Sequence, residues 1–181
     1  MPTTNDITLG SGRIYIVEYT GATIPADATI ETSANQFGYT KGGATLSYET
    51  EYTTIEDDNG DIKEEFLSSD SMTFSCGAFM GKPEDIVRIC PTATSTTSGG
   101  ITTVKLGGVS NDNNKKYVIR FVHKDGHLRS TIVGKNTDGF ELAFSADDAV
   151  RLEPTFTCSA MTGGVLAEIA FNPTGVTGTT A

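Results

Sequence analysis

The chain has 181 residues, a length that favours a single domain able to bury a core without disulfides or a structural metal. Its formal net charge is −10, because 23 Asp and Glu outnumber 13 Lys and Arg, and no block of basic residues appears. A protein that grips nucleic-acid phosphates needs clustered cations, so the charge balance argues against that function class.

The first forty residues predict an arm, a strand and a loop. The N-terminal segment MPTTNDITLGSG is polar, and no run of the chain is long enough to span a bilayer as a helix, so we expect neither a signal peptide nor a membrane anchor. We interpret residues 1–10 as an N-terminal arm and residues 13–20, RIYIVEYT, as the first strand. Residues 21–41 are rich in turn formers and predict an extended loop.

Residues 42–79 predict one very long β-hairpin. Apolar residues alternate with Ser, Thr and Glu along both arms: Leu46, Tyr48, Tyr52, Phe66, Met72, Phe74 and Cys76. Asn59-Gly60 suits a tight turn between the arms, and the broken alternation at residues 67–71 predicts a bulge or bend. Each arm would extend roughly 40 Å at about 3.4 Å per residue, which is about twice a typical strand. An exposed edge of that length invites pairing with another chain.

Residues 82–91 predict the only convincing helix. Pro83 suits a first turn, the acidic pair that follows complements the positive end of the helix dipole, and Pro91 ends the helix. Residues 92–100 are rich in Ser, Thr and Gly and indicate a flexible connector.

The second half of the chain predicts mainly strands. Four or five of them follow the connector, at about 101–107, 116–124, 128–136, 139–145 and 150–158, and a last strand, VLAEIAF, closes the fold. The turn KDG predicts a second hairpin within this set, and residues 172–181 predict a flexible tail. Many strands with one short helix predict a mainly β single domain: a β-sandwich or barrel with one flanking short helix and a long protruding hairpin.

No motif of catalysis or cofactor binding is evident. DDNGD at 57–61 resembles the start of a calcium loop, but Ile62 and Ser68 stand where an EF-hand needs Gly and Glu, so a hairpin turn is favoured. His123 and His127 flank an Asp-Gly turn with no third ligand evident, and we interpret them as surface imidazoles. There is no nucleophile elbow, phosphate loop or acid/base pair, so we expect no enzyme, no cofactor and no metal. Three distant cysteines predict reduced, buried thiols: Cys76, Cys90 and Cys158.

Three stretches of the chain resemble the tail tube (major tail) proteins of long-tailed bacteriophages, most closely those of Gram-positive hosts. These are LGSGRIYIVEYTG, FGYTKGGATLSYETEYTTIEDDNG and KKYVIRFVHKDGHLRSTIVGKNTDGFELAF, and the resemblance runs from about Leu9 to Phe171. It implies a β-sandwich or barrel with one flanking helix, six copies of which form a ring. Such rings stack into a tube through which the viral genome passes into the host.

The resemblance also implies roles for the two faces of the hairpin. One face would pack on the core of the subunit, through Leu46, Tyr48, Phe66, Phe74 and Cys76. The other would line the lumen, through Glu49, Glu51, Lys63, Glu65, Ser71, Thr73 and Ser75. An acidic and hydroxyl-rich wall would repel the DNA rather than bind it, and Lys63 would pair with Glu65 or with a neighbour's Glu51. A solvated sheet face of a monomer would produce the same alternation.

Contacts between rings are expected at the hairpin tip. The candidates are acidic residues at the tip and basic residues in a loop: Asp57, Asp58, Asp61, Lys115 and Lys116. A solvated acidic turn is the alternative interpretation.

The expected partners are other copies of the chain and other tail proteins, namely tail tip, tape measure and terminator. DNA would pass through without specific binding, no membrane is involved, and the product, made in the host cytoplasm, would reside in the virion tail. Two other functions stay open: the inner tube of a contractile injection or bacteriocin particle, and a monomeric β-sandwich binding module.

Overall fold

Antiparallel strands make up most of the regular structure in the computed structural model, which describes residues 12–21, 23–56, 58–59, 63–79, 82–142 and 151–172. The strands are β1 (Gly12–Tyr19), β2 (Tyr39–Glu56), β3 (Lys63–Phe79), β4 (Thr94–Ser98), β5 (Ile101–Lys105), β6 (Lys116–His123), β7 (Leu128–Asn136), β8 (Arg151–Leu152), β9 (Thr155–Cys158) and β10 (Ala167–Phe171). The helices are α1 (Asp27–Ile30), α2 (Pro83–Ile89) and the 3-10 helix η2 (Val109–Asn111). No helix among these residues is long and apolar enough to cross a membrane.

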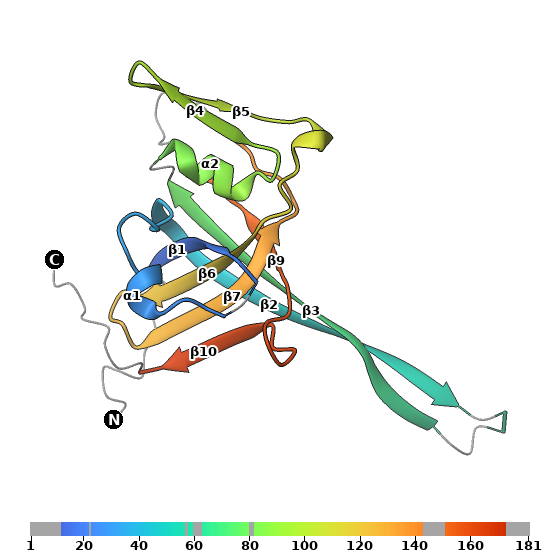
Figure 1. Ribbon diagram of the computed structural model, residues 1–181. Coiled ribbons are helices and arrows are strands. Elements are labelled where there is room, and N and C mark those ends of the chain that lie inside the picture. The colour runs from blue at the N-terminus through green and yellow to red at the C-terminus, as the bar shows by residue number, and fades with distance from the viewer. Residues whose placement is uncertain are drawn as a thin grey trace.

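One eight-stranded sheet forms the body, in the order β1-β6-β7-β9-β3-β2, with β10 added to β7 and β8 added to β3 (Figure 1). The sheet curls so that its two outer strands approach, and the Thr40 hydroxyl on β2 donates a hydrogen bond to the carbonyl oxygen of Gly12 on β1. The close pairing of β7 with β9 requires a glycine, because a Cβ atom at Gly134 would lie 2.5 Å from the carbonyl oxygen of Thr157. The expected mainly β fold is confirmed.

The central strands are buried on both faces of the sheet. One face carries the main core, which includes Ile14, Ile119 and Phe156. The opposite face packs alternate residues of the same strands, such as Val118 and Val133, against Ile30 of α1. Almost every residue of β6 and β7 is therefore buried, as expected of strands covered on both sides.

Two buried arginines hold α1 against the sheet. Arg120 on β6 and Arg129 on β7 form ion pairs with both Asp27 and Glu31, and the Arg120 Nε also donates to the Thr131 hydroxyl at 3.1 Å. Arg129 Nε lies 2.8 Å from Glu31 Oε1, although its N–H is not aimed for a hydrogen bond. The guanidinium groups are thus buried beside carboxylates rather than alone.

The predicted elements are confirmed in several places. The first strand, the long hairpin, the helix after it and the KDG hairpin all form, and β7 has the predicted bounds of 128–136. The region 150–158 is divided, because Glu153 and Pro154 interrupt β8 and β9.

Three predictions are wrong. The loop at 21–41 contains α1, the connector at 92–100 contains β4, and residues 139–142 form no strand. The rest of the expected strand at 139–145, the arm at 1–10 and most of the tail at 172–181 lie outside the described residues.

Candidate functional site

The most prominent feature of the molecule is a two-stranded ribbon, formed by the outer parts of β2 and β3, that projects far from the body (Figure 1). The strands pair from Tyr39 with Phe79 to Glu56 with Lys63. Among the described strands β2 pairs only with β3, and β3 has other partners only at residues 73–75 and 78–79. All side chains at 47–56 and 63–71 are exposed. A two-stranded ribbon without a core is at best marginally stable in water.

A β-bulge at Ser68 divides the ribbon. Glu51 pairs with Ser69 and Tyr52 pairs with Leu67, so Ser68 is the extra residue. Both serines bind Glu51: the Ser68 hydroxyl donates to its backbone oxygen at 2.9 Å, and the Ser69 hydroxyl donates to its carboxylate at 2.8 Å. The bulge predicted at 67–71 is confirmed. Because one extra residue inverts the alternation of β3, side chains of β3 beyond the bulge change faces.

The inversion places large apolar side chains on both faces of the ribbon. Tyr48, Tyr52 and Leu67 lie on the face that continues from the core and are 54%, 61% and 52% exposed. Ile55 and Phe66 lie on the opposite face and are 59% and 49% exposed. Neither face is covered by the residues that the structure describes.

The seven residues expected to line a lumen do not share one face. Five of them do share a face: Glu49, Glu51, Ser71, Thr73 and Ser75. Glu49 is paired with Ser71, and both alternate along their strands with the core-facing residues.

Lys63 and Glu65 lie on the other face, where they pair with Glu56 and Thr54, so the expectation that they belong with Glu49 is wrong. The bulge is the physical reason. The Lys63 amine forms its ion pair with Glu56, at 2.9 Å, and not with Glu65.

The expected core face of the hairpin is only partly buried. Phe74 and Cys76 are buried, and Leu46 packs against the same core cluster. Burial raises the pKa of the Cys76 thiol to about 12. Tyr48 and Phe66 were expected in the core and are exposed, because the body ends at the level where β9 joins β3. The Tyr48 hydroxyl instead lies 3.2 Å from the Asp70 carboxylate.

Most of the expected contacts between rings remain predictions. Asp57 and Asp61 lie outside the described residues, and Asp58 is exposed in the turn. Lys115 has a partner within the chain: its amine lies 2.7 Å from the Glu18 carboxylate, and this hydrogen bond raises the pKa of Lys115. Lys116 is exposed at the start of β6.

One cluster of side chains was missed by sequence reasoning. His123 is buried, which contradicts its interpretation as a surface imidazole, and it lies beside His127 and Asp125. The sequence suggests no third ligand beside the two histidines, but Asp125 of the turn supplies a third polar side chain.

Comparison with known proteins identifies only distant structural similarity. No protein-family model and no curated protein matches the chain. A chain in a structure described as "Virion of native gene transfer agent (GTA) particle" is similar over 90% of this chain and 96% of its own length, with a TM-score of 0.42 and 11% identity. A chain in "Tail of empty GTA particle computed with helical refinement, C6 symmetry" is similar over 96% and 100%, with a TM-score of 0.43 and 11% identity.

Proposed function

We propose that the chain is the structural subunit of a phage tail tube. Copies form six-membered rings, and the rings stack into a hollow tube that conducts the viral genome into the host. The observation that carries the proposal is the projecting ribbon, with large apolar side chains exposed on both faces and an unpaired outer edge on β2. The resemblance of the sequence to tail tube proteins supports the same function.

A second copy of the chain is the partner that suits the ribbon. β2 stands at one end of the sheet order, and an end strand leaves a row of backbone donors and acceptors to pair. At the other end, β1 already forms backbone hydrogen bonds with residues 35–37 of its own chain. When the ribbon of one copy contacts a different surface of the next copy, the interface is head-to-tail. Repeating a head-to-tail interface closes a ring when the rotation from one copy to the next is a whole fraction of 360°. In that ring the ribbon packs on the neighbour through Tyr48, Tyr52 and Leu67.

The opposite face of the ribbon, nearer the body, lines the lumen in this proposal. It carries Glu49, Glu51, Ser71, Thr73 and Ser75, and it has no Lys or Arg between residues 45 and 55 of β2 or 64 and 75 of β3. DNA carries about one negative charge per 1.7 Å of axis, so a wall without cations gives the phosphates nothing to bind. Repulsion from all sides keeps the polyanion centred.

Beyond the bulge the same face meets the next ring. Ile55 and Phe66 are the apolar side chains there, and the exposed Asp58 would pair with cations such as Lys116 of the next ring. Asp57 and Asp61, close to Asp58 in the sequence, remain candidates for the same contact. The lumen and the stacking contact are thus two parts of one ribbon face. The remaining partners in the proposal are the tail tip, tape measure and terminator proteins, and the location is the virion tail.

Electron microscopy of the purified full chain tests the proposal, with size-exclusion light scattering on the same sample. Rings or tubes with a hollow centre are the expected result. A monodisperse monomer at every concentration, even with tail tips added as seeds, would overturn it and favour a monomeric binding module. A sheath gene beside the gene for this chain would assign the tube to a contractile particle.

A further inference from the structure

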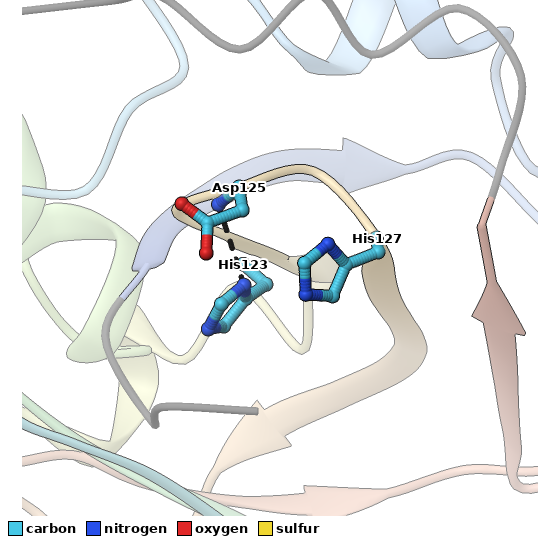
Figure 2. Close-up of side chains that lie close together, drawn as sticks. All are labelled: His123, Asp125 and His127. Carbon is cyan, nitrogen blue, oxygen red and sulfur yellow. Dashed lines mark hydrogen bonds between the residues drawn. The ribbon is translucent and has the colours of Figure 1, made fainter. Parts of the chain in front are cut away.

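The turn between β6 and β7 gathers both histidines of the chain around an aspartate (Figure 2). His123 ends β6, Asp125 lies in the turn, and His127 directly precedes β7. One ligand atom from each residue can be chosen so that all three lie within 4.8 Å of one another. The two imidazole rings are 5.1 Å apart between centroids and tilted by 35°.

The hydrogen bonding of this cluster is incomplete. His127 Nε2 is buried and has no hydrogen-bond partner among the described residues. A buried polar atom without a partner is unfavourable, so this imidazole nitrogen is a candidate for binding a ligand. The His123 ring is oriented by the backbone N–H of Asp125, which donates to His123 Nδ1 at 3.3 Å. The Asp125 carboxylate is at the exposed side of the cluster, where an ion from solvent can enter.

We propose that His123, Asp125 and His127 form a binding site for a divalent transition metal, with Zn²⁺ as the best fit. Two imidazole nitrogens and one carboxylate oxygen are ligands that Zn²⁺ accepts, with water in the fourth position, whereas Ca²⁺ and Mg²⁺ prefer sets made of oxygen. At bond lengths of about 2.0–2.1 Å, donors in a tetrahedral site are roughly 3.3 Å apart. Small side-chain rotations therefore bring the three ligands to these distances. His123 and His127 rotate at the ends of β6 and β7, and Asp125 rotates in the four-residue turn between these strands.

Binding at this site connects the ends of β6 and β7, next to the ends of β1 and β10. His123 is paired with Gly12 at the start of β1, and the backbone N–H of Asn172, just after β10, donates to the His127 carbonyl oxygen at 2.8 Å. An ion bound only by the folded chain stabilises it by mass action, so the metal acts as a staple at this corner of the sheet. This inference does not depend on the proposed tube function.

The test uses the full chain without a histidine tag, stripped of metal by a chelator and titrated with ZnCl₂ in a calorimeter. One ion per chain and a rise in Tm that EDTA reverses are expected. His127→Gln and Asp125→Asn should each weaken binding at least about tenfold, because even residues behind a metal's ligands contribute about 10–100-fold to affinity. Circular dichroism confirms that both variants are folded.

A cysteine thiolate is the alternative ligand for Zn²⁺, and Cys90→Ser is the matched control, since Cys90 is a half-buried thiol that is not part of the His123–Asp125–His127 cluster. This variant should bind Zn²⁺ as the parent chain does. Co²⁺ in place of Zn²⁺ should show visible d–d absorption without a thiolate charge-transfer band. The inference is overturned by no saturable binding, by binding that survives both His127→Gln and Asp125→Asn, or by a thiolate band lost in Cys90→Ser.

Discussion

Replacing Tyr52 and Leu67 together by serine should block assembly and leave the isolated chain folded. The two residues form one cross-strand pair on the ribbon and are 61% and 52% exposed. Complete burial of a large apolar side chain contributes about 1.5–3 kcal/mol, so covering the exposed half of each adds about 1 kcal/mol per side chain. The pair then contributes about 2 kcal/mol to each contact between copies, which is a factor of roughly 30 in the association constant.

The assay is the critical concentration for tube formation, measured by light scattering and pelleting. We expect it to rise roughly 30-fold in Tyr52→Ser/Leu67→Ser, because each copy added to the tube loses one such contact. The matched control is Thr50→Ser/Thr54→Ser, which places two serines on the same face of the same ribbon without removing a large apolar group. Urea unfolding of the monomeric double variant should change by about 0.5 kcal/mol or less, since both side chains are exposed.

Two results would refute this reasoning. An unchanged critical concentration would mean that the Tyr52–Leu67 face is not a contact between copies. A monomer destabilised by several kcal/mol would mean that the pair packs on the body of its own chain, contrary to the register and exposure of the ribbon.

Three further predictions concern the ion-pair network, the buried thiol and the lumen. Glu31→Ala should lower the free energy of unfolding by about 2–3 kcal/mol, measured by urea titration. It removes one of the two carboxylates beside guanidinium groups that are only 6% and 9% exposed. Glu31→Gln should lower the free energy of unfolding by less. Burial raises the pKa of the Cys76 thiol from 9.0 to about 12. The contribution of this thiol to the free energy of unfolding is therefore complete below pH 9 and is lost as the pH rises towards 12. In Cys76→Ala, the fall of the unfolding free energy between pH 9 and pH 12 should be smaller by about 1.4 kcal/mol per pH unit. Tubes of Glu49→Lys/Glu51→Lys should retain DNA in filter-binding assays at low salt and release it at high salt, whereas tubes of the parent chain should not bind it.

Local patterns in the sequence were sufficient for the hairpins. Strand β7 has the bounds expected from alternation and from the KDG turn, since both signals lie within a few residues of the strand. The Ser68 bulge was also visible as broken alternation.

Elements held by distant partners could not be predicted in the same way. Helix α1 has four residues and no apolar period, and it is held by Arg120 and Arg129, which lie 93 and 102 positions away from Asp27 in the sequence. The composition of strand β4, TSTTS, predicts a linker rather than a strand. Its threonines suit a strand once β5 is beside it, and the hydroxyls of Thr97 and Thr102 lie 3.0 Å apart across the pair.

The error in assigning the ribbon's faces has a structural consequence for assembly. Tyr48 and Phe66 were placed together in one core, but the bulge puts them on opposite faces, and both are about half-exposed. One flat partner surface cannot cover both sides of a two-stranded ribbon. Burying both faces therefore requires two surfaces from other molecules, and a tube of stacked rings supplies two: the neighbour within the ring for Tyr52 and Leu67, and the next ring for Ile55 and Phe66. A simple dimer would leave one of these apolar sets in water, which is why the ribbon favours a stacked assembly over a closed pair.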